Sequence, residues 1–178
     1  MKKYLALLLA VLMVASLCAC GQKDTGSDLQ TVTKGKLIMS TNAEFAPYEY
    51  VADDGKGFQG TGYEGIDIEI AYALAQKLGL ELVVDNMDFD AALSAVQTGK
   101  SDMVAAGVTV TPDRLNAMSF TDSYANGVQV VIVKEGSDIK SIDDLQGKKI
   151  GTQRGTTGFL YCSDDFGDDN VIGFDDGA

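Results

Sequence analysis

The sequence predicts an α/β protein built on a parallel sheet. Apolar residues recur with helical spacing from Ile66 to Leu78, and short apolar runs stand on both sides of this segment. A second segment of helical pattern, 90–98, is followed by another apolar run. The resulting order of strand, helix, strand, helix and strand is typical of a parallel sheet whose faces are covered by helices.

The first half of the chain contains the clearest predicted elements. Asp67 is predicted as the N-cap of the helix that begins near Ile66, and Gly79 as the glycine that ends it. Gly99 ends the second helix in the same way, and residues 53–57 have the composition of a hairpin turn. The strands predicted here are short apolar runs bounded by polar residues or glycine: 36–40, 48–51, 80–84 and 102–106.

The second half continues with weaker signals. Thr111 followed by Pro112 predicts a helix start, because Thr caps the free N–H groups and Pro presets the backbone. The continuous apolar run Val128–Val133 predicts a strand. The remaining predicted elements are a short helix after Ser141, a strand over 148–152, a helix opened by 155–158 and a strand over 171–174.

Residues 1–19 have the pattern of a secretory signal peptide. Lys2 and Lys3 precede the apolar run Leu5–Val14, which is shorter than the roughly 20 residues needed to span a bilayer. The segment ends in Leu-Cys-Ala-Cys, which resembles the bacterial lipobox and implies cleavage before Cys20 and lipidation of its thiol. A plain secretory signal with an incidental cysteine is the alternative. Residues 20–35 are then a lipidated N-terminus and flexible linker.

Composition excludes several classes of function. The 178 residues carry 14 basic and 26 acidic side chains and no His, a net charge of −12, which argues against a nucleic-acid partner. With no His and only three Cys, His-based zinc sites and His-dependent catalytic triads are excluded. The aspartates do not form a calcium-binding loop, so no metal or cofactor is expected.

Three polar segments follow predicted strands, where ligands bind in open α/β sheets: 42–45, 106–114 and 154–158. Gly107 lets the backbone approach a ligand closely, and Thr109 supplies a hydroxyl. Arg114, one of only two arginines, has a planar fork suited to a carboxylate. A surface ion pair is an equally good interpretation of Arg114 from composition alone. The aromatic residues Phe45 and Phe89 fit either a ligand surface or the core.

Several segments together resemble one family. They are Thr41 to Glu49 (TNAEFAPYE), Gly65 to Ala71 (GIDIEIA), Met87 to Asp90 (MDFD), Ala106 to Arg114 (AGVTVTPDR), Phe120 to Asp122 (FTD) and Gln153 to Gly158 (QRGTTG). This set resembles the family 3 bacterial extracellular solute-binding proteins of polar amino-acid ABC importers. The resemblance implies a type II periplasmic-binding-protein fold of two lobes, with lobe one over 36–126 and a crossing strand and partial lobe two over 127–178. Family members normally continue further, so the second lobe is expected to be incomplete.

The resemblance also implies a role for each matched position. Arg114, Thr109 and Thr157 would hold the α-carboxylate of a free amino acid, and the carbonyl of Ala106 or Gly107 would accept from its α-ammonium. The other positions would surround the ligand: Phe45 as a cover, Phe89 and Asn42 near its side chain, and Gln153 or Arg154 at the wall of lobe two. Asn42 stands where binders of cationic amino acids often carry Asp, which favours another polar ligand.

The function implied is capture of a free, polar amino acid by a monomeric, lipid-anchored protein outside the cytoplasm, which delivers it to an ABC permease. Two alternatives are a cyclohexadienyl-dehydratase-like lyase on the same scaffold and a sensory ligand-binding module.

Overall fold

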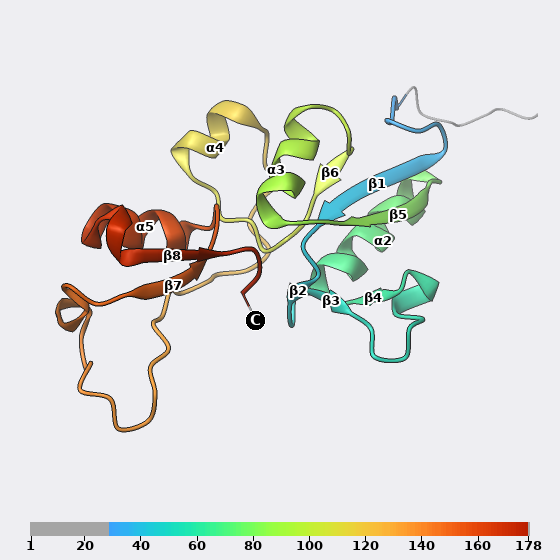
Figure 1. Ribbon diagram of the computed structural model, residues 1–178. Helices are drawn as coiled ribbons and strands as arrows, with labels where there is room; N and C mark the ends of the chain where they lie inside the picture. The colour runs from blue at the N-terminus through green and yellow to red at the C-terminus, as the bar shows by residue number, and fades with distance from the viewer. Residues whose placement is uncertain (1–28, 178) are drawn as a thin grey trace, which may run out of the picture.

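The computed structural model describes residues 29–177; the predicted signal segment, Cys20 and the first part of the predicted linker lie outside this range. Its first sheet is parallel and has the strand order β5-β1-β6 (Figure 1). The strands are β1 (Lys36–Thr41), β5 (Glu81–Asn86) and β6 (Met103–Val104). The predicted parallel sheet is therefore confirmed.

Helices α2 (Ile66–Leu78) and α3 (Phe89–Gln97) cover the two faces of this sheet (Figure 1). Crossover connections are almost always right-handed, and the connections β1 to β5 and β5 to β6 run in opposite directions across the sheet, which places their helices on opposite faces. Met39 packs with Ile68 and Ala71 of α2, whereas Phe89 and Leu93 of α3 pack with Ala106 on the other face.

The start of α2 differs from the prediction. Gly65, not Asp67, is the N-cap, with φ of 122°. A Cβ at Gly65 would lie 2.2 Å from the carbonyl oxygen of Tyr48, so the helix docks against the backbone of Tyr48 through a residue without a side chain. Asp67 is inside the first turn and fully buried. Gly79 ends the helix in the left-handed conformation, as predicted.

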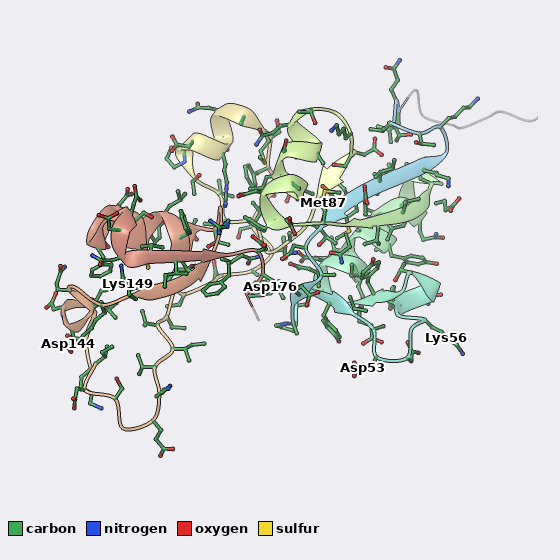
Figure 2. The ribbon with its side chains drawn as sticks, viewed as in Figure 1. Asp53, Lys56, Met87, Asp144, Lys149 and Asp176 are labelled. Carbon is green, nitrogen blue, oxygen red and sulfur yellow. The ribbon has the colours of Figure 1, made fainter. Side chains whose placement is uncertain are left out.

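A small antiparallel sheet, β2-β3-β4, lies beside the first one. Its strands are β2 (Glu44–Phe45), β3 (Glu49–Val51) and β4 (Tyr63–Glu64). The predicted turn connects β3 to the short helix η1 (Phe58–Gly60), and Asp53 and Lys56 mark its outer end (Figure 2). Strands β2 and β4 were not predicted, because two residues are too few to show an alternating pattern.

The chain leaves the first sheet through α4 (Pro112–Ala117). The strand predicted over Val128–Val133 is wrong: no strand is formed there, and Val128 and Ile132 are 85% and 93% exposed. A strand needs a partner for its backbone groups, and within residues 29–177 no other strand pairs with this segment. It runs into the extended orange loop that precedes β7 (Figure 1).

The second sheet consists of two parallel strands, β7 (Ile150–Gln153) and β8 (Val171–Phe174). Helix α5 (Thr157–Phe166) packs beside them, and Thr156 caps its start by accepting from the N–H of Phe159 (Figure 1). The short helices η2 (Ile142–Leu145) and η3 (Asp168–Asn170) complete this half. Within residues 29–177, no helix combines the length and apolar character needed to cross a membrane.

Candidate functional site

The three polar segments predicted from the sequence meet between the two parallel sheets. Gln153, at the end of β7, donates from Nε2 to Oδ1 of Asn42, which follows β1, over 2.8 Å. Arg114 of α4 donates from Nη2 to the carbonyl oxygen of Gly155 over 2.9 Å. Gln153, Asn42 and Gly155 lie at or just beyond the carboxyl ends of strands, where α/β proteins bind ligands, and Arg114 reaches this edge from α4.

Arg114 is held by the backbone on one side and by an aromatic ring on the other. Thr111 accepts from the Arg114 N–H as the helix cap, and Nη1 of Arg114 donates to the carbonyl oxygen of Thr109 over 2.8 Å. Its guanidinium carbon lies 5.6 Å from the centre of the Phe89 ring. Burial lowers the pKa of Arg114, and the nearby Asp90 partly offsets this effect. Neither ion pair formed within residues 29–177 involves Arg114, so the surface-ion-pair interpretation has no support.

Two aromatic rings border the Gly107 loop. Phe45 is 50% exposed and stacks on Tyr48 with 5.3 Å between ring centres. Gly107 has φ of 54°, and a Cβ there would lie 3.1 Å from the Phe45 ring. The glycine thus permits both the left-handed turn and the close approach of the ring. Phe89, in contrast, is buried and packs in the core while facing Arg114.

Thr157 lies at the first position of α5 and is buried. Its hydroxyl accepts from Nε2 of Gln129 over 3.3 Å. The N-terminus of this ten-residue helix presents backbone N–H groups, which favour an anion. Gln129 and the helix therefore position Thr157, and no sequence pattern indicates the Gln129 contact.

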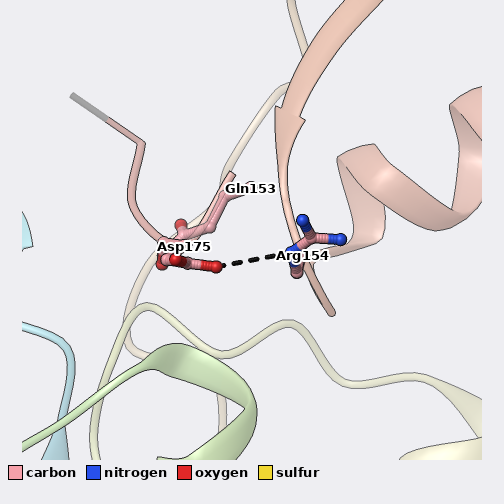
Figure 3. Close-up of polar contacts among 3 residues, drawn as sticks. All are labelled: Gln153, Arg154 and Asp175. Carbon is pink, nitrogen blue, oxygen red and sulfur yellow. Dashed lines mark hydrogen bonds and ion pairs between the residues drawn. The ribbon is translucent and has the colours of Figure 1, made fainter. Parts of the chain in front are cut away.

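Gln153 and Arg154 take different directions (Figure 3). Gln153 reaches across to Asn42 and also donates to the carbonyl oxygen of Asp175 over 3.2 Å. Arg154 pairs with the carboxylate of Asp175 over 3.4 Å, a contact between two exposed side chains. Of the two alternatives for the lobe-two wall, the structure brings Gln153 to the first sheet.

Both the nitrogen and the oxygen of the Asn42 side-chain amide form hydrogen bonds. Its Nδ2 donates over 3.0 Å to the carbonyl oxygen of Met87, the residue just after β5 (Figure 2). Its Oδ1 receives the Gln153 bond. The result is a neutral pair of amides between the two sheets.

Two acidic residues were not predicted as parts of this region. Asp67 accepts the N–H of Gly107 at its Oδ2 over 2.9 Å. Asp90 packs so closely against Gly155 that a Cβ at Gly155 would lie 1.5 Å from its Oδ1. Both contacts join residues at least 40 positions apart, so no local pattern indicates them.

Other features of the described residues do not form a competing site. A hollow of about 300 Å³ lies near Tyr50 and Phe58, and none of the predicted ligand residues lines it. Among residues 29–177, no group of three or more Cys, Asp or Glu side chains is arranged to hold a metal ion.

The two parallel sheets contact each other through residues that lie beyond the ends of their strands. This arrangement is that of a type II periplasmic-binding-protein fold, as the sequence predicted. Residues 37–170 match the family described as bacterial extracellular solute-binding proteins, family 3. The chain belongs to this family.

Individual relatives agree with this assignment. The arginine-binding extracellular protein ArtP of Bacillus subtilis is 38% identical over 88% of this chain and 57% of its own length. A probable histidine-binding protein of Neisseria gonorrhoeae is 36% identical over 96% of this chain and 62% of its own. The structure of an ancestral arginine-binding protein bound to glutamine superposes with a TM-score of 0.72 at 38% identity, covering 81% of this chain and 62% of that one.

The chain therefore spans about three fifths of the length of the relatives it matches. All three relatives are named for binding rather than catalysis, which supports the predicted binding protein over the lyase alternative.

Proposed function

We propose that this protein captures a free, polar amino acid between its two sheets outside the cytoplasm. The observation that carries the proposal is the position of Arg114, which contacts both halves and takes part in no ion pair within residues 29–177. A half-buried guanidinium without a carboxylate partner is well suited to bind the carboxylate of a ligand.

The remaining donors of Arg114 suffice for this role. A guanidinium has five N–H groups, and the two carbonyl oxygens of Thr109 and Gly155 each accept from a different terminal nitrogen. The α-carboxylate would bind the other N–H groups, with Thr109 and Thr157 as further donors. The carbonyl of Ala106 or Gly107 would accept from the α-ammonium, and Phe45 would cover the ligand.

The ligand side chain would point toward the Asn42–Gln153 amide pair. This pair is neutral and offers hydrogen-bonding groups, so it favours a polar side chain. The relatives named for arginine and histidine, and the one bound to glutamine, make these three amino acids the first to test.

The family and the N-terminal sequence support a proposal for delivery and attachment. As a monomer anchored to the membrane by lipidated Cys20, the protein would release its amino acid to an ABC permease when its halves separate. The family description, which names extracellular proteins, supports this location.

Replacement of Arg114 tests the proposal. In protein expressed from the complete reading frame that contains these residues, Arg114→Ala is expected to weaken amino-acid binding by about 2–5 kcal/mol, because it removes the charged partner of a buried carboxylate. Arg114→Lys keeps the charge but lacks the fork, so a smaller loss is expected.

Titration calorimetry with the twenty amino acids measures both effects. Lys77→Ala, which removes one exposed positive charge from the last turn of α2, is the matched control and should leave affinity unchanged. Unaltered affinity in Arg114→Ala would remove this residue from the site.

A further inference from the structure

Two acidic side chains are buried side by side beneath the Gly107 loop. Glu49 of β3 is 1% exposed and Asp67 of α2 is 0% exposed. The backbone places them together, because the Asp67 N–H donates over 2.9 Å to the carbonyl oxygen of Tyr48, the residue before Glu49. The two ion pairs found within residues 29–177 involve other side chains.

One oxygen of each carboxyl group lacks a donor. Glu49 Oε2 and Asp67 Oδ1 are both buried and have no hydrogen-bond partner among the described residues when both groups are ionised. Two adjacent buried carboxylates repel each other strongly, whereas one proton between them removes a charge and supplies the missing donor. A single shared proton therefore gives both oxygen atoms a hydrogen-bond partner.

The surroundings indicate which residue carries the proton. Asp67 lies in the first turn of α2, where the helix dipole favours a negative charge, and its Oδ2 accepts the Gly107 N–H. Burial, followed by the charge of Asp67 and hydrogen bonding to it, raises the pKa of Glu49 to about 10. The proton of the pair is therefore assigned to Glu49.

The other titratable groups near the pair are tyrosines. Burial raises the pKa of Tyr124, from the segment after α4, and hydrogen bonding to Asp67 and the charges of Asp67 and Glu49 raise it further. The neighbouring Tyr48 also raises the pKa of Tyr124. Tyr124 therefore stays neutral at physiological pH and supplies no positive charge to the pair.

One peptide of the proposed site is hydrogen-bonded to this pair. The N–H of Gly107 and the carbonyl of Ala106 belong to one planar peptide and point in opposite directions. Because the N–H is bound to Asp67, the carbonyl is directed away from the buried pair. We propose that Glu49 and Asp67 share one proton and act together as positioning residues that hold this peptide in a single orientation. The inference rests on the proposed function in so far as this carbonyl accepts from the ligand ammonium.

Carboxyl carbon NMR without any amino acid tests the shared proton. In ¹³C-labelled protein, the signal lost in Glu49→Gln identifies Glu49 Cδ, and it should keep the chemical shift of a protonated acid from about pH 5 to about pH 8. Asp67→Asn removes the neighbouring charge, so Glu49 should ionise at a lower pH. A Glu49 signal that titrates near its ordinary range in the wild-type protein overturns the shared proton.

Hydrogen exchange of the Gly107 amide tests the positioning role. Protection should persist in Glu49→Gln, whose amide still donates to Asp67, and in Asp67→Asn, which keeps an acceptor. Asp67→Ala should exchange at least about tenfold faster at Gly107, while the amides of β1 keep their rates and show that the chain is folded. If Asp67→Ala does not fold, Asp67→Ser provides the same comparison.

Glu69→Gln is the matched control, since it removes an exposed carboxylate from the same helix and should change neither signal. Equal Gly107 exchange in wild type and a folded Asp67→Ala or Asp67→Ser variant overturns the positioning role. Both measurements are made without ligand, so failure of amino-acid binding would leave their result unaffected.

Discussion

Asp67 illustrates how a residue can match a local pattern and serve a different purpose. Its type and place suggest a helix cap, yet its carboxylate accepts from Gly107, which is 40 positions away. The cap position belongs to Gly65, because the carbonyl of Tyr48 leaves no space for a side chain there. Burial of an acidic residue depends on tertiary contacts, which the local sequence does not contain.

The protonation of Glu49 has a consequence for stability. Its pKa is about 10 in the folded protein against an ordinary value of 4.5, so between these values the folded state holds one proton more than the unfolded state. Stability from this group is therefore fully present below pH 4.5 and is lost as pH rises toward 10.

Comparison with Glu49→Gln isolates this effect. From about pH 5 to about pH 8, the folding equilibrium constant of the wild type should fall relative to that of the variant by up to about tenfold per pH unit. Urea unfolding at several pH values measures the ratio. A ratio that is independent of pH would show that Glu49 ionises equally in both states.

The ligand residues were predicted from the order of motifs, and the structure brings several of them together. Arg114 contacts the Thr109 carbonyl and the Phe89 ring, and Asn42 contacts Gln153. Their roles in binding remain predictions. Gln129, which contacts Thr157, and Asp90, which contacts Gly155, were not predicted, because these contacts depend on how the two sheets approach each other.

At the scale of elements, sequence signals succeeded where the interaction is local. Thr111 caps α4 and Gly79 ends α2, since both act on backbone groups within one turn. The predicted strand over Val128–Val133 failed, because an apolar run becomes a strand only beside another strand. The short strands β2 and β4 exist through their pairing with β3.

Two glycines bordering α2 permit a matched test of local strain. Gly65→Ala should destabilise the protein by at least about 2 kcal/mol, because the new Cβ meets the Tyr48 carbonyl and φ is unfavourable for other residues. Gly79→Ala has the same unfavourable sign of φ but open space around it, so a loss of about 1 kcal/mol is expected. Urea unfolding measures both; equal losses would show that the docking contact is unimportant.

Within residues 29–177, few side-chain hydrogen bonds join the two parallel sheets. Arg114 and Gln153 provide hydrogen bonds between the halves, and their total energy is small compared with that of a packed core. Such a junction suits proteins that open and close around a ligand. The two-sheet architecture was predictable from motif order, whereas the bonds across the junction were not.

The acidic molecule is proposed to remain at the membrane through Cys20 alone. Removal of Lys2 and Lys3 with the signal segment leaves 12 basic and 26 acidic residues, so the mature charge is 12 − 26 = −14. Anionic lipids would repel such a surface, and a lipid anchor would have to hold it.

Cys20→Ala is therefore expected to shift the protein from the membrane fraction to the soluble fraction. Immunoblots of the two fractions, together with mass spectrometry of the mature N-terminus, measure this shift. Cys162→Ala is the control and should not alter the distribution, because this cysteine lies within α5. Membrane retention of Cys20→Ala would argue for the plain secretory signal or another means of attachment.

Arg114 binds oxygens of the main chain at positions 109 and 155, not their side chains. The guanidinium therefore keeps its place when the identity of residue 109 changes, provided that the loop retains its course. Replacing that threonine would therefore measure what its hydroxyl adds to carboxylate binding while the guanidinium keeps its position.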